Sequence, residues 1–204
     1  MLNYIYGSDL DDFPQLRDTM FQDRAKQFRD RMGWDVTVNE AGFELDEYDE
    51  QNPLYVICAD SLGDHAGSLR LLPTTGDTMV NDHFSHLAGG HISSPFIWEC
   101  TRFCLAPGSR PRVAAALMLA GGEVLTGFDI SHFVGVFDAS MRRIYKMIGA
   151  EPEVLGSDGG INVGLWSLSA AAQAKVAHKA GVSLTQSRAW FDASFDQVIP
   201  RLRA

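Results

Sequence analysis

The chain has 204 residues, of which 46% are hydrophobic and 21% are charged, so it is long enough to bury one sizeable core. Its formal net charge of −9 argues against nucleic-acid binding, because phosphate contacts require a basic face. No apolar run reaches the roughly 20 residues of a membrane helix and the N-terminus lacks signal-peptide features, so we expect a single cytoplasmic domain over residues 1–204, without membrane insertion.

Strand and helix patterns alternate along the chain. Residues 2–6 are predicted to form a strand, and apolar positions at every three or four residues predict a helix over 12–32, which Gly33 ends. Residues 35–52 carry many acids without a sustained period and are predicted to form a long loop. Further strands are predicted over 54–59, 68–72, 96–105, 132–137 and 162–168, and further helices over 81–87, 111–128, 139–148, 169–179 and 184–198. This alternation indicates an α/β fold with three layers around a central mixed sheet.

Charged residues interrupt the apolar pattern. Arg70 lies within one predicted strand, and Glu99 and Arg102 lie within another. A charge in an apolar strand is unfavourable unless it is paired or functional. One interpretation is a structural ion network made of Arg24, Arg70 and Arg102 with Asp46, Asp49 and Glu99. An active site would gather the same charges, so the residues alone leave both interpretations open.

The other polar and aromatic residues indicate less. The aromatic residues close to these charges belong to types found more often in cores than in ligand contacts: Phe28, Trp34, Phe84 and Phe103. The spacing of Asp82, His83, His86 and His91 matches no pattern that closes a zinc site, so no metal is expected. The three cysteines are an odd number and suggest no disulfide framework.

Taken in order, several short motifs resemble those of the acyl-homoserine-lactone synthases. They are Arg24-x3-Phe28-x5-Trp34, Asp46-x2-Asp49, Arg70, Phe84 and Trp98-Glu99-x2-Arg102-Phe103. The similarity covers about residues 2–164 and implies a fold similar to the GCN5-related N-acetyltransferases, a three-layer α-β-α sandwich with a twisted, splayed mixed sheet. Residues 106–111 lack the pyrophosphate-binding loop of the coenzyme A-dependent acetyltransferases. The resemblance therefore implies acyl carrier protein as the acyl donor, with acyl-CoA as the other candidate.

The resemblance implies a two-step reaction. The α-amine of S-adenosylmethionine takes the acyl group from its thioester. The carboxylate of the same molecule then displaces the sulfonium, which closes a lactone and releases methylthioadenosine. S-adenosylmethionine is thus a consumed substrate, no cofactor is expected, and the product is a quorum-sensing signal.

The resemblance also assigns the site residues. The expected catalytic group is Glu99, Arg70 and Arg102, and S-adenosylmethionine binding is expected at Arg24, Phe28, Trp34, Asp46, Asp49, Phe84 and Phe103. Glu99, acting through a water, is the candidate base for the amine, which titrates at about 8. Phe28 and Trp34 suit the sulfonium and the adenine.

The other charged residues have separate expected roles. Asp46 and Asp49 give the pocket of the cation a partly anionic character. Arg24 or Arg102 could hold the substrate carboxylate as a forked pair. Arg70 is expected to orient the acidic loop.

The strand at 96–105 carries a geometric requirement. Glu99 and Arg102 are three residues apart, so a regular strand would point them to opposite faces. If both reach one site, the strand must bulge or splay between them. Further along, Phe137 falls near the position at which relatives that use 3-oxoacyl groups carry a threonine, which argues against a 3-oxo preference.

The predicted helix at 139–148 offers a docking surface for an acidic acyl carrier protein. Apolar residues at three-to-four spacing predict the buried face, formed by Met141, Ile144, Tyr145 and Ile148. The same spacing leaves three basic residues towards solvent, namely Arg142, Arg143 and Lys146. A solvated helix face is the simpler interpretation of such a cluster, and basic residues on the equivalent helix of relatives favour docking.

Two other function classes stay open. An acetyltransferase-like enzyme could acylate another amine from an acyl-CoA. A non-enzymatic sensor could bind acyl lactones, although such a regulator should carry a helix-turn-helix with a basic recognition face. The predicted C-terminal helices show no such cluster.

Overall fold

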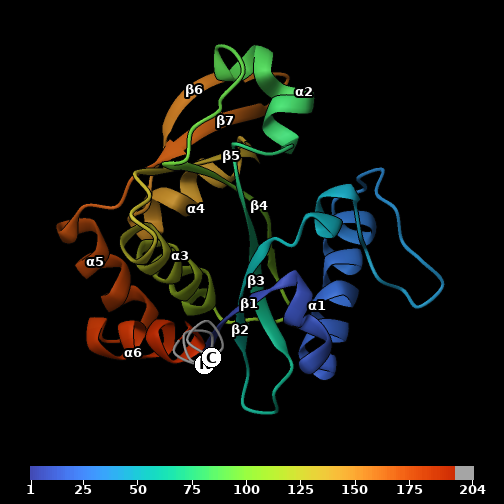
Figure 1. The fold of residues 1–204 in the computed structure, drawn as a ribbon, viewed down its shortest axis with the longest axis vertical. Helices are drawn as coiled ribbons and strands as arrows, with labels where there is room; N and C mark the ends of the chain where they lie inside the picture. The colour runs from blue at the N-terminus through green and yellow to red at the C-terminus, as the bar shows by residue number, and fades with distance from the viewer. Residues whose placement is uncertain (196–204) are drawn as a thin grey trace, which may run out of the picture.

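A mixed sheet runs through the molecule (Figure 1). Within residues 1–195, which the computed structural model describes, its seven strands have the order β1-β2-β3-β4-β5-β7-β6. The strands are β1 (Leu2–Tyr6), β2 (Leu54–Ala59), β3 (His65–Pro73), β4 (Ile97–Leu105), β5 (His132–Asp138), β6 (Glu153–Asp158) and β7 (Ile161–Trp166). β4 and β5 are parallel, and the other neighbouring pairs are antiparallel.

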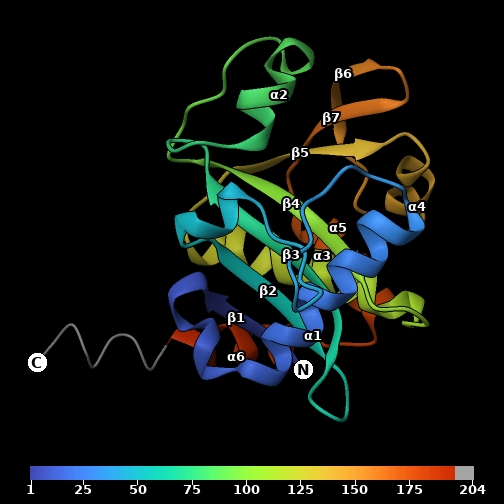
Figure 2. The same ribbon diagram turned by 90° about the vertical axis from the view of Figure 1, so that its right-hand side faces the viewer.

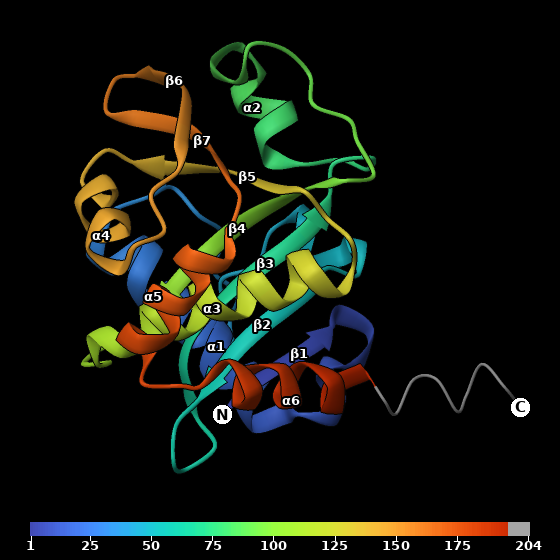
Figure 3. The same ribbon diagram turned by 90° about the vertical axis from the view of Figure 1, so that its left-hand side faces the viewer.

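Helices cover both faces of the sheet and confirm the expected three layers. They are α1 (Pro14–Ala25), α2 (Met79–Ala88), α3 (Pro111–Gly127), α4 (Met141–Ile148), α5 (Ala170–Ala180) and α6 (Leu184–Phe195). α1 lies across one face, which we call the front (Figure 2). α3, α5 and α6 cover the other face, the back (Figure 3). α2 lies against β6 and β7 on the far side of the sheet from α6 (Figure 1).

Three apolar clusters hold the layers together, and the smallest of them joins Val80 of α2 to Val134 of β5 and Val163 of β7. On the back, α3 buries Leu117 and Val124 in a cluster that also contains residues of α5 and α6. On the front, α1 packs Met20 and Phe21 against Ile57 of β2. Burying a side chain of this size typically contributes about 1.5–3 kcal/mol. Helices are therefore fixed on both faces of the sheet by separate apolar clusters.

The sheet splays between β4 and β5. Their pairing joins Ile97–Glu99 to His132–Val134, and within the described residues it stops there. A Cβ on Gly135 would lie 2.7 Å from the carbonyl oxygen of Cys100, so a glycine is needed at the point where the strands separate. Beyond this point the remainder of β4 faces an opening, which the site uses.

A bulge interrupts β4 beside this opening. Ser68 of β3 faces Cys104, whereas Arg70 faces Thr101, so β4 contains one more residue than β3 over this stretch. Arg102 lies inside it with φ of 51°, a conformation that side chains rarely adopt. The predicted break between Glu99 and Arg102 is confirmed, and it turns the Arg102 side chain to the front.

The structure also departs from the predicted elements. β6 was missed because it is a largely exposed edge strand with weak apolar alternation. The predicted helix at 12–32 begins instead at Pro14, which suits a first helical position, and its last part is a π-helical segment, Lys26–Arg31. The predicted loop at 35–52 contains a 3-10 helix, Glu47–Gln51. The end of the predicted helix at 184–198 lies outside the described residues.

No helix among residues 1–195 is both long enough and apolar enough to cross a bilayer.

Candidate active site

Three arginines and three acids meet on the front of the sheet, where α1, β3, β4 and the acidic loop come together. They are Arg24, Arg70 and Arg102 with Glu44, Asp46 and Asp49. The two sets of charges balance, which makes their burial tolerable. The ion network considered from the sequence is present, with Glu44 in the place expected for Glu99.

Arg24 lies at the centre of this network. Its Nε is 2.6 Å from Glu44 Oε2, and its two terminal nitrogens each lie 2.9 Å from a different oxygen of Asp49. Burial alone would lower the pKa of Arg24, but the Asp49 and Glu44 carboxylates outweigh it and raise that pKa. All three guanidinium nitrogens of Arg24 are engaged within the network and the side chain is 1% exposed, so Arg24 has no nitrogen left for a fork to a substrate carboxylate.

Arg70 orders the acidic loop, as expected. Its guanidinium pairs with Asp46 and lies 2.7 Å from Asp49 Oδ1. The loop supports the same geometry through a capping box: the backbone N–H of Tyr48 donates to Asp46 at 3.0 Å, and that of Asp46 donates to Asp49 at 2.9 Å. Burial would raise the pKa of Asp49, but Arg24 and Arg70 hold that pKa well below its ordinary range.

Glu44 is the member of the network that the sequence analysis missed. It is completely buried and contacts both Arg24 and Arg102, at 2.6 and 2.9 Å. A signal was present, since Glu44 stands between Phe43 and Leu45, and a charge flanked by apolar residues indicates burial with a partner.

Glu99 stands apart from the arginines. It is buried, and its carboxylate accepts hydrogen bonds from the backbone N–H groups of Met79, at 3.1 Å, and Val80, at 2.6 Å, in the first turn of α2. Burial raises the pKa of Glu99 to about 7, although these hydrogen bonds act in the opposite direction. A carboxyl with this pKa can accept and return a proton near neutral pH.

Arg102 joins the network to an aromatic stack. Its guanidinium lies 5.4 Å from the centroid of the Phe28 ring, and Trp34 stacks on Phe28 at 5.1 Å with an interplanar angle of 11°. Phe28 is buried, whereas Trp34 is 40% exposed, so Trp34 presents the outer ring of the stack. Arg31, which the sequence analysis missed, is exposed beside them and lines the same cavity.

One cavity of about 650 Å³ connects the two faces of the sheet through the splay. Its front part is lined by Phe28, Arg31, Trp34 and Arg102, beside the charged network. Its back part extends along one face of α3, where the lining residues are Ala114, Met118, Gly121, Gly122 and Leu125. The expected site residues Phe84 and Phe103 line it as well. A ligand could therefore place a charged end and an apolar end in one continuous space.

Aromatic rings close the side of the cavity towards α4. The ring of Tyr145 lies 5.4 Å from Phe137, 5.3 Å from Trp166 and 6.4 Å from Phe103, each in an edge-to-face arrangement. Trp166 donates its indole N–H to the carbonyl of Ala150 at 3.0 Å. Phe137, expected to argue against a 3-oxo substrate, thus belongs to an aromatic wall.

Cys100 is the thiol that lines this cavity. Burial raises its pKa to about 12, and the Glu99 carboxylate adds to the shift. The thiol therefore stays protonated at neutral pH and is a poor nucleophile.

α4 presents its three basic residues to solvent as expected: Arg142, Arg143 and Lys146. Its predicted buried face is partly wrong. Tyr145 and Ile148 are buried, but Ile144 is 36% exposed, and Met147 is 54% exposed. α4 is short and borders the cavity through Met141, Ile144 and Tyr145, and part of its apolar face remains exposed.

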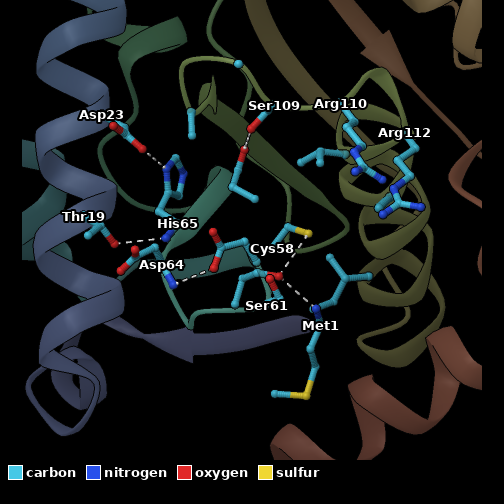
Figure 4. A pocket seen from close by; sticks show the side chains of 18 of the residues that line it. Met1, Thr19, Asp23, Cys58, Ser61, Asp64, His65, Ser109, Arg110 and Arg112 are labelled. Carbon is cyan, nitrogen blue, oxygen red and sulfur yellow. Dashed lines mark hydrogen bonds and ion pairs between the residues drawn. The ribbon is translucent and has the colours of Figure 1, made fainter.

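A second cavity, of about 900 Å³, lies where β2 turns into β3, between α1 and the loop before α3 (Figure 4). On its wall His65 Nδ1 lies 2.9 Å from Asp23, and Nε2 lies 2.9 Å from Ser68 Oγ. All three are buried, so this chain of contacts joins α1 to β3 and presents no accessible nucleophile. Arg110 and Arg112, at the start of α3, are exposed on the rim.

Over the part of the chain that the structure describes, no three His, Cys, Asp or Glu side chains come together as metal ligands would.

Comparison with known sequences gives a consistent picture. A family model described as autoinducer synthase matches residues 10–162. An acyl-homoserine-lactone synthase of Rhizobium etli is 41% identical over 165 residues, which are 75% of this chain and 77% of that protein.

Comparison with solved structures extends the similarity to the fold. The structure of a CoA-dependent acyl-homoserine lactone synthase, BjaI, with SAM and isopentyl-CoA, superposes with a TM-score of 0.79 at 21% identity, covering 89% of this chain and 90% of that one. An acyl-CoA N-acyltransferase from Pseudomonas aeruginosa shares the fold more distantly, with a TM-score of 0.52 at 15% identity over 82% of this chain and 99% of that one. The expected relation to the N-acetyltransferase fold is confirmed.

Proposed function

The chain belongs to the autoinducer synthase family and is an acyl-homoserine-lactone synthase, and from that premise we propose that its acyl donor is an acyl carrier protein in the cytoplasm. It transfers the acyl group to the α-amine of S-adenosylmethionine, closes the lactone and releases methylthioadenosine. The observation that supports this reaction is the cavity that joins the charged front to an apolar back through the splay. S-adenosylmethionine is cationic and polar, the acyl chain is apolar, and the two must meet.

In the proposed complex S-adenosylmethionine lies in the front part of the cavity. The exposed face of Trp34 suits the adenine or the sulfonium. The substrate carboxylate is placed at Arg102, whose Nη1 has no partner among residues 1–195, with Arg31 beside it. Arg24, Arg70, Asp46 and Asp49 hold this surface in place.

The first step forms the amide. The amine nitrogen attacks the thioester carbonyl, the thiolate leaves, and the proton lost by the amine passes through a water to Glu99. The Glu99 carboxylate is buried behind Met79, which lines the cavity, so it does not contact the substrate amine directly. One water bridges the amine and Glu99. The amine, which titrates at about 8, needs this help at neutral pH.

The second step closes the ring. One carboxylate oxygen attacks the γ-carbon of the methionine chain, which is bonded to the sulfur. The bond between this carbon and the sulfur breaks, and the electron pair of that bond stays on the sulfur and neutralises the sulfonium. The products are the lactone and methylthioadenosine. No proton needs to move in this step, so the protein only has to hold the carboxylate in line with the leaving sulfur.

Release of methylthioadenosine tests the reaction directly. The purified protein is incubated with S-adenosylmethionine and an acyl donor, and methylthioadenosine and acyl lactone are quantified by mass spectrometry. Equal amounts of both products are expected. An acylated amine without methylthioadenosine would favour the acetyltransferase alternative, and tight lactone binding without turnover would favour a sensor.

The choice of acyl carrier protein rests on α4. An acidic carrier meets repulsion from a chain of net charge −9, so docking needs a local basic surface. Arg142, Arg143 and Lys146 provide it, and the exposed Ile144 and Met147 beside them add apolar contacts. This combination suits the acidic, partly apolar surface of a carrier helix.

Charge reversal at two surfaces distinguishes the donors. Arg142→Glu with Lys146→Glu should raise the KM for acyl carrier protein and weaken its salt dependence, while a short carrier-free acyl thioester is little affected. The matched control is Arg110→Glu with Arg112→Glu, on the rim of the second cavity, where the phosphates of coenzyme A could reach the start of α3. If the control variant alone loses activity, and loses it with acyl-CoA, coenzyme A is the donor.

A further inference from the structure

Gly121 occupies the middle of α3 without a packing reason. Glycine destabilises a helix interior relative to alanine, because it loses more backbone freedom on folding. A Cβ built on Gly121 would meet Phe133 Cε2 at 3.4 Å, an ordinary van der Waals distance, and no second atom within 4 Å. Alanine would therefore fit, and glycine leaves a space.

The next residue makes a clear contrast. A Cβ on Gly122 would lie 2.4 Å from Leu168 Cδ2 and 3.3 Å from the Gln173 amide. Gly122 is needed because the chain between β7 and α5 packs directly on it. Packing therefore explains why position 122 is a glycine, but it does not explain the glycine at position 121.

The space at Gly121 belongs to the back part of the cavity. Phe133, its neighbour, pairs with Trp98 in the short stretch where β4 and β5 are still joined. The splay opens away from this stretch, so Gly121 and Phe133 stand at the closed end of the cavity. The lining at this end comes from Gly121, Phe133 and Leu125, which are apolar.

A thioester that reacts beside Glu99 would send its acyl tail towards this closed end. The α3 face that lines the cavity runs from Ala114 to Leu125, a length of about 16 Å at 1.5 Å per residue. The part of the acyl donor that carries the thioester enters from the open side of the cavity. The closed end is then occupied by the acyl tail. Any side chain at position 121 would project into that space.

We propose that Gly121 sets the length of the acyl chain, and that the open space it leaves selects a long linear acyl group. The inference rests on the proposed function and specifies the substrate class of the same site. Gly121 acts by its missing side chain and takes no part in the chemistry.

A chain-length series tests it. Wild type, Gly121→Ala and Gly121→Val are compared with butanoyl, octanoyl and dodecanoyl thioesters, with methylthioadenosine release as the readout. Since one methylene in an apolar pocket changes kcat/KM by roughly 10-fold or more, Gly121→Val should lose at least that much with dodecanoyl and keep butanoyl turnover. Gly121→Ala should show the smaller loss while its Tm rises, because alanine is the better helix former. Damage to the fold would lower Tm instead.

Gly122→Ala is the matched control. It makes the same change in helix propensity, but its Cβ would displace Leu168, so its Tm should fall, in contrast to the rise expected for Gly121→Ala. An unchanged chain-length profile in both Gly121 variants, or a wild type that prefers butanoyl, overturns the inference and leaves the proposed function intact. Absence of methylthioadenosine from wild type with every donor overturns the proposed function, and the inference with it.

Discussion

The two parts of the cavity are built differently. The front is bordered by a network in which every charged group has two or more partners, and Arg24, Glu44 and Arg70 are fully buried. The back is bordered by apolar and aromatic side chains along α3 and α4. β4 separates the two, with its bulge at Arg102 facing the front.

The difference shows how one site can be strict and adaptable at the same time. A buried ion network tolerates no single substitution, because the partner that remains is left charged and unpaired. An apolar wall has no such partners and can change in size with small losses. We therefore expect single substitutions in the network to abolish recognition of S-adenosylmethionine, and substitutions in the apolar wall to alter acyl selection with small losses.

The largest expected effect is on the chemistry that links the two parts. Glu99→Gln keeps the shape of the side chain and removes the base, so kcat should fall by about 10²–10⁴. In wild type, kcat should rise as the pH passes through about 7, the pKa to which burial raises Glu99, and this rise should be absent from the variant. Rates from pH 5 to 9 measure both effects, and a variant that turns over like wild type at neutral pH would exclude Glu99 as the base.

The next effect is a difference in the free energy of unfolding between a variant in the ion network and a variant in the aromatic wall. Arg24→Met leaves Glu44 and Asp49 buried without their main partner and should lower the free energy of unfolding by about 3–5 kcal/mol. Phe137→Leu, in the aromatic wall, should cost less, about 1–2 kcal/mol. Denaturant titration of both variants measures the difference, and equal losses would show that the network is no more sensitive than the wall.

The pH dependence of stability sharpens the comparison further. Glu99 has a raised pKa, so its contribution to stability is present below its ordinary value of 4.5 and is lost as the pH rises through about 7. Asp49 has a lowered pKa, so its contribution is present above its ordinary value of 3.8 and is lost in stronger acid. Between pH 5 and 7 wild type should therefore lose stability relative to Glu99→Gln. Parallel unfolding curves for the two proteins across this range would contradict the raised pKa.

The smallest effect concerns the acidic loop. Residues 46–51 are held by Arg70 and by their capping box, whereas every residue from 35 to 43 is exposed or half-buried. S-adenosylmethionine should therefore increase hydrogen-exchange protection over 35–43 and change 46–51 little. A gain over 46–51 alone would show that the network itself forms only with substrate.

Much of the fold could be predicted because its strands and helices follow local hydrophobic periods. The bounds of β1 and β2 agree with the predicted ones, and α3 differs by one residue at its end. β6 could not be predicted, because an exposed edge strand buries too little apolar surface to leave a pattern. The site motifs could be recognised because several spaced residues together are specific where each alone is weak.

The sequence by itself determined that charged side chains would interrupt apolar strands and that the chain resembles the lactone synthases. Only the tertiary structure decided which charges pair. Glu44 reaches Arg102, 58 residues away in sequence, whereas Glu99 turns to the first turn of α2. The bulge that brings Arg102 to the front depends on register against β3, and the space at Gly121 depends on the position of Phe133. Such contacts join segments far apart in the chain, and local periodicity carries no information about them.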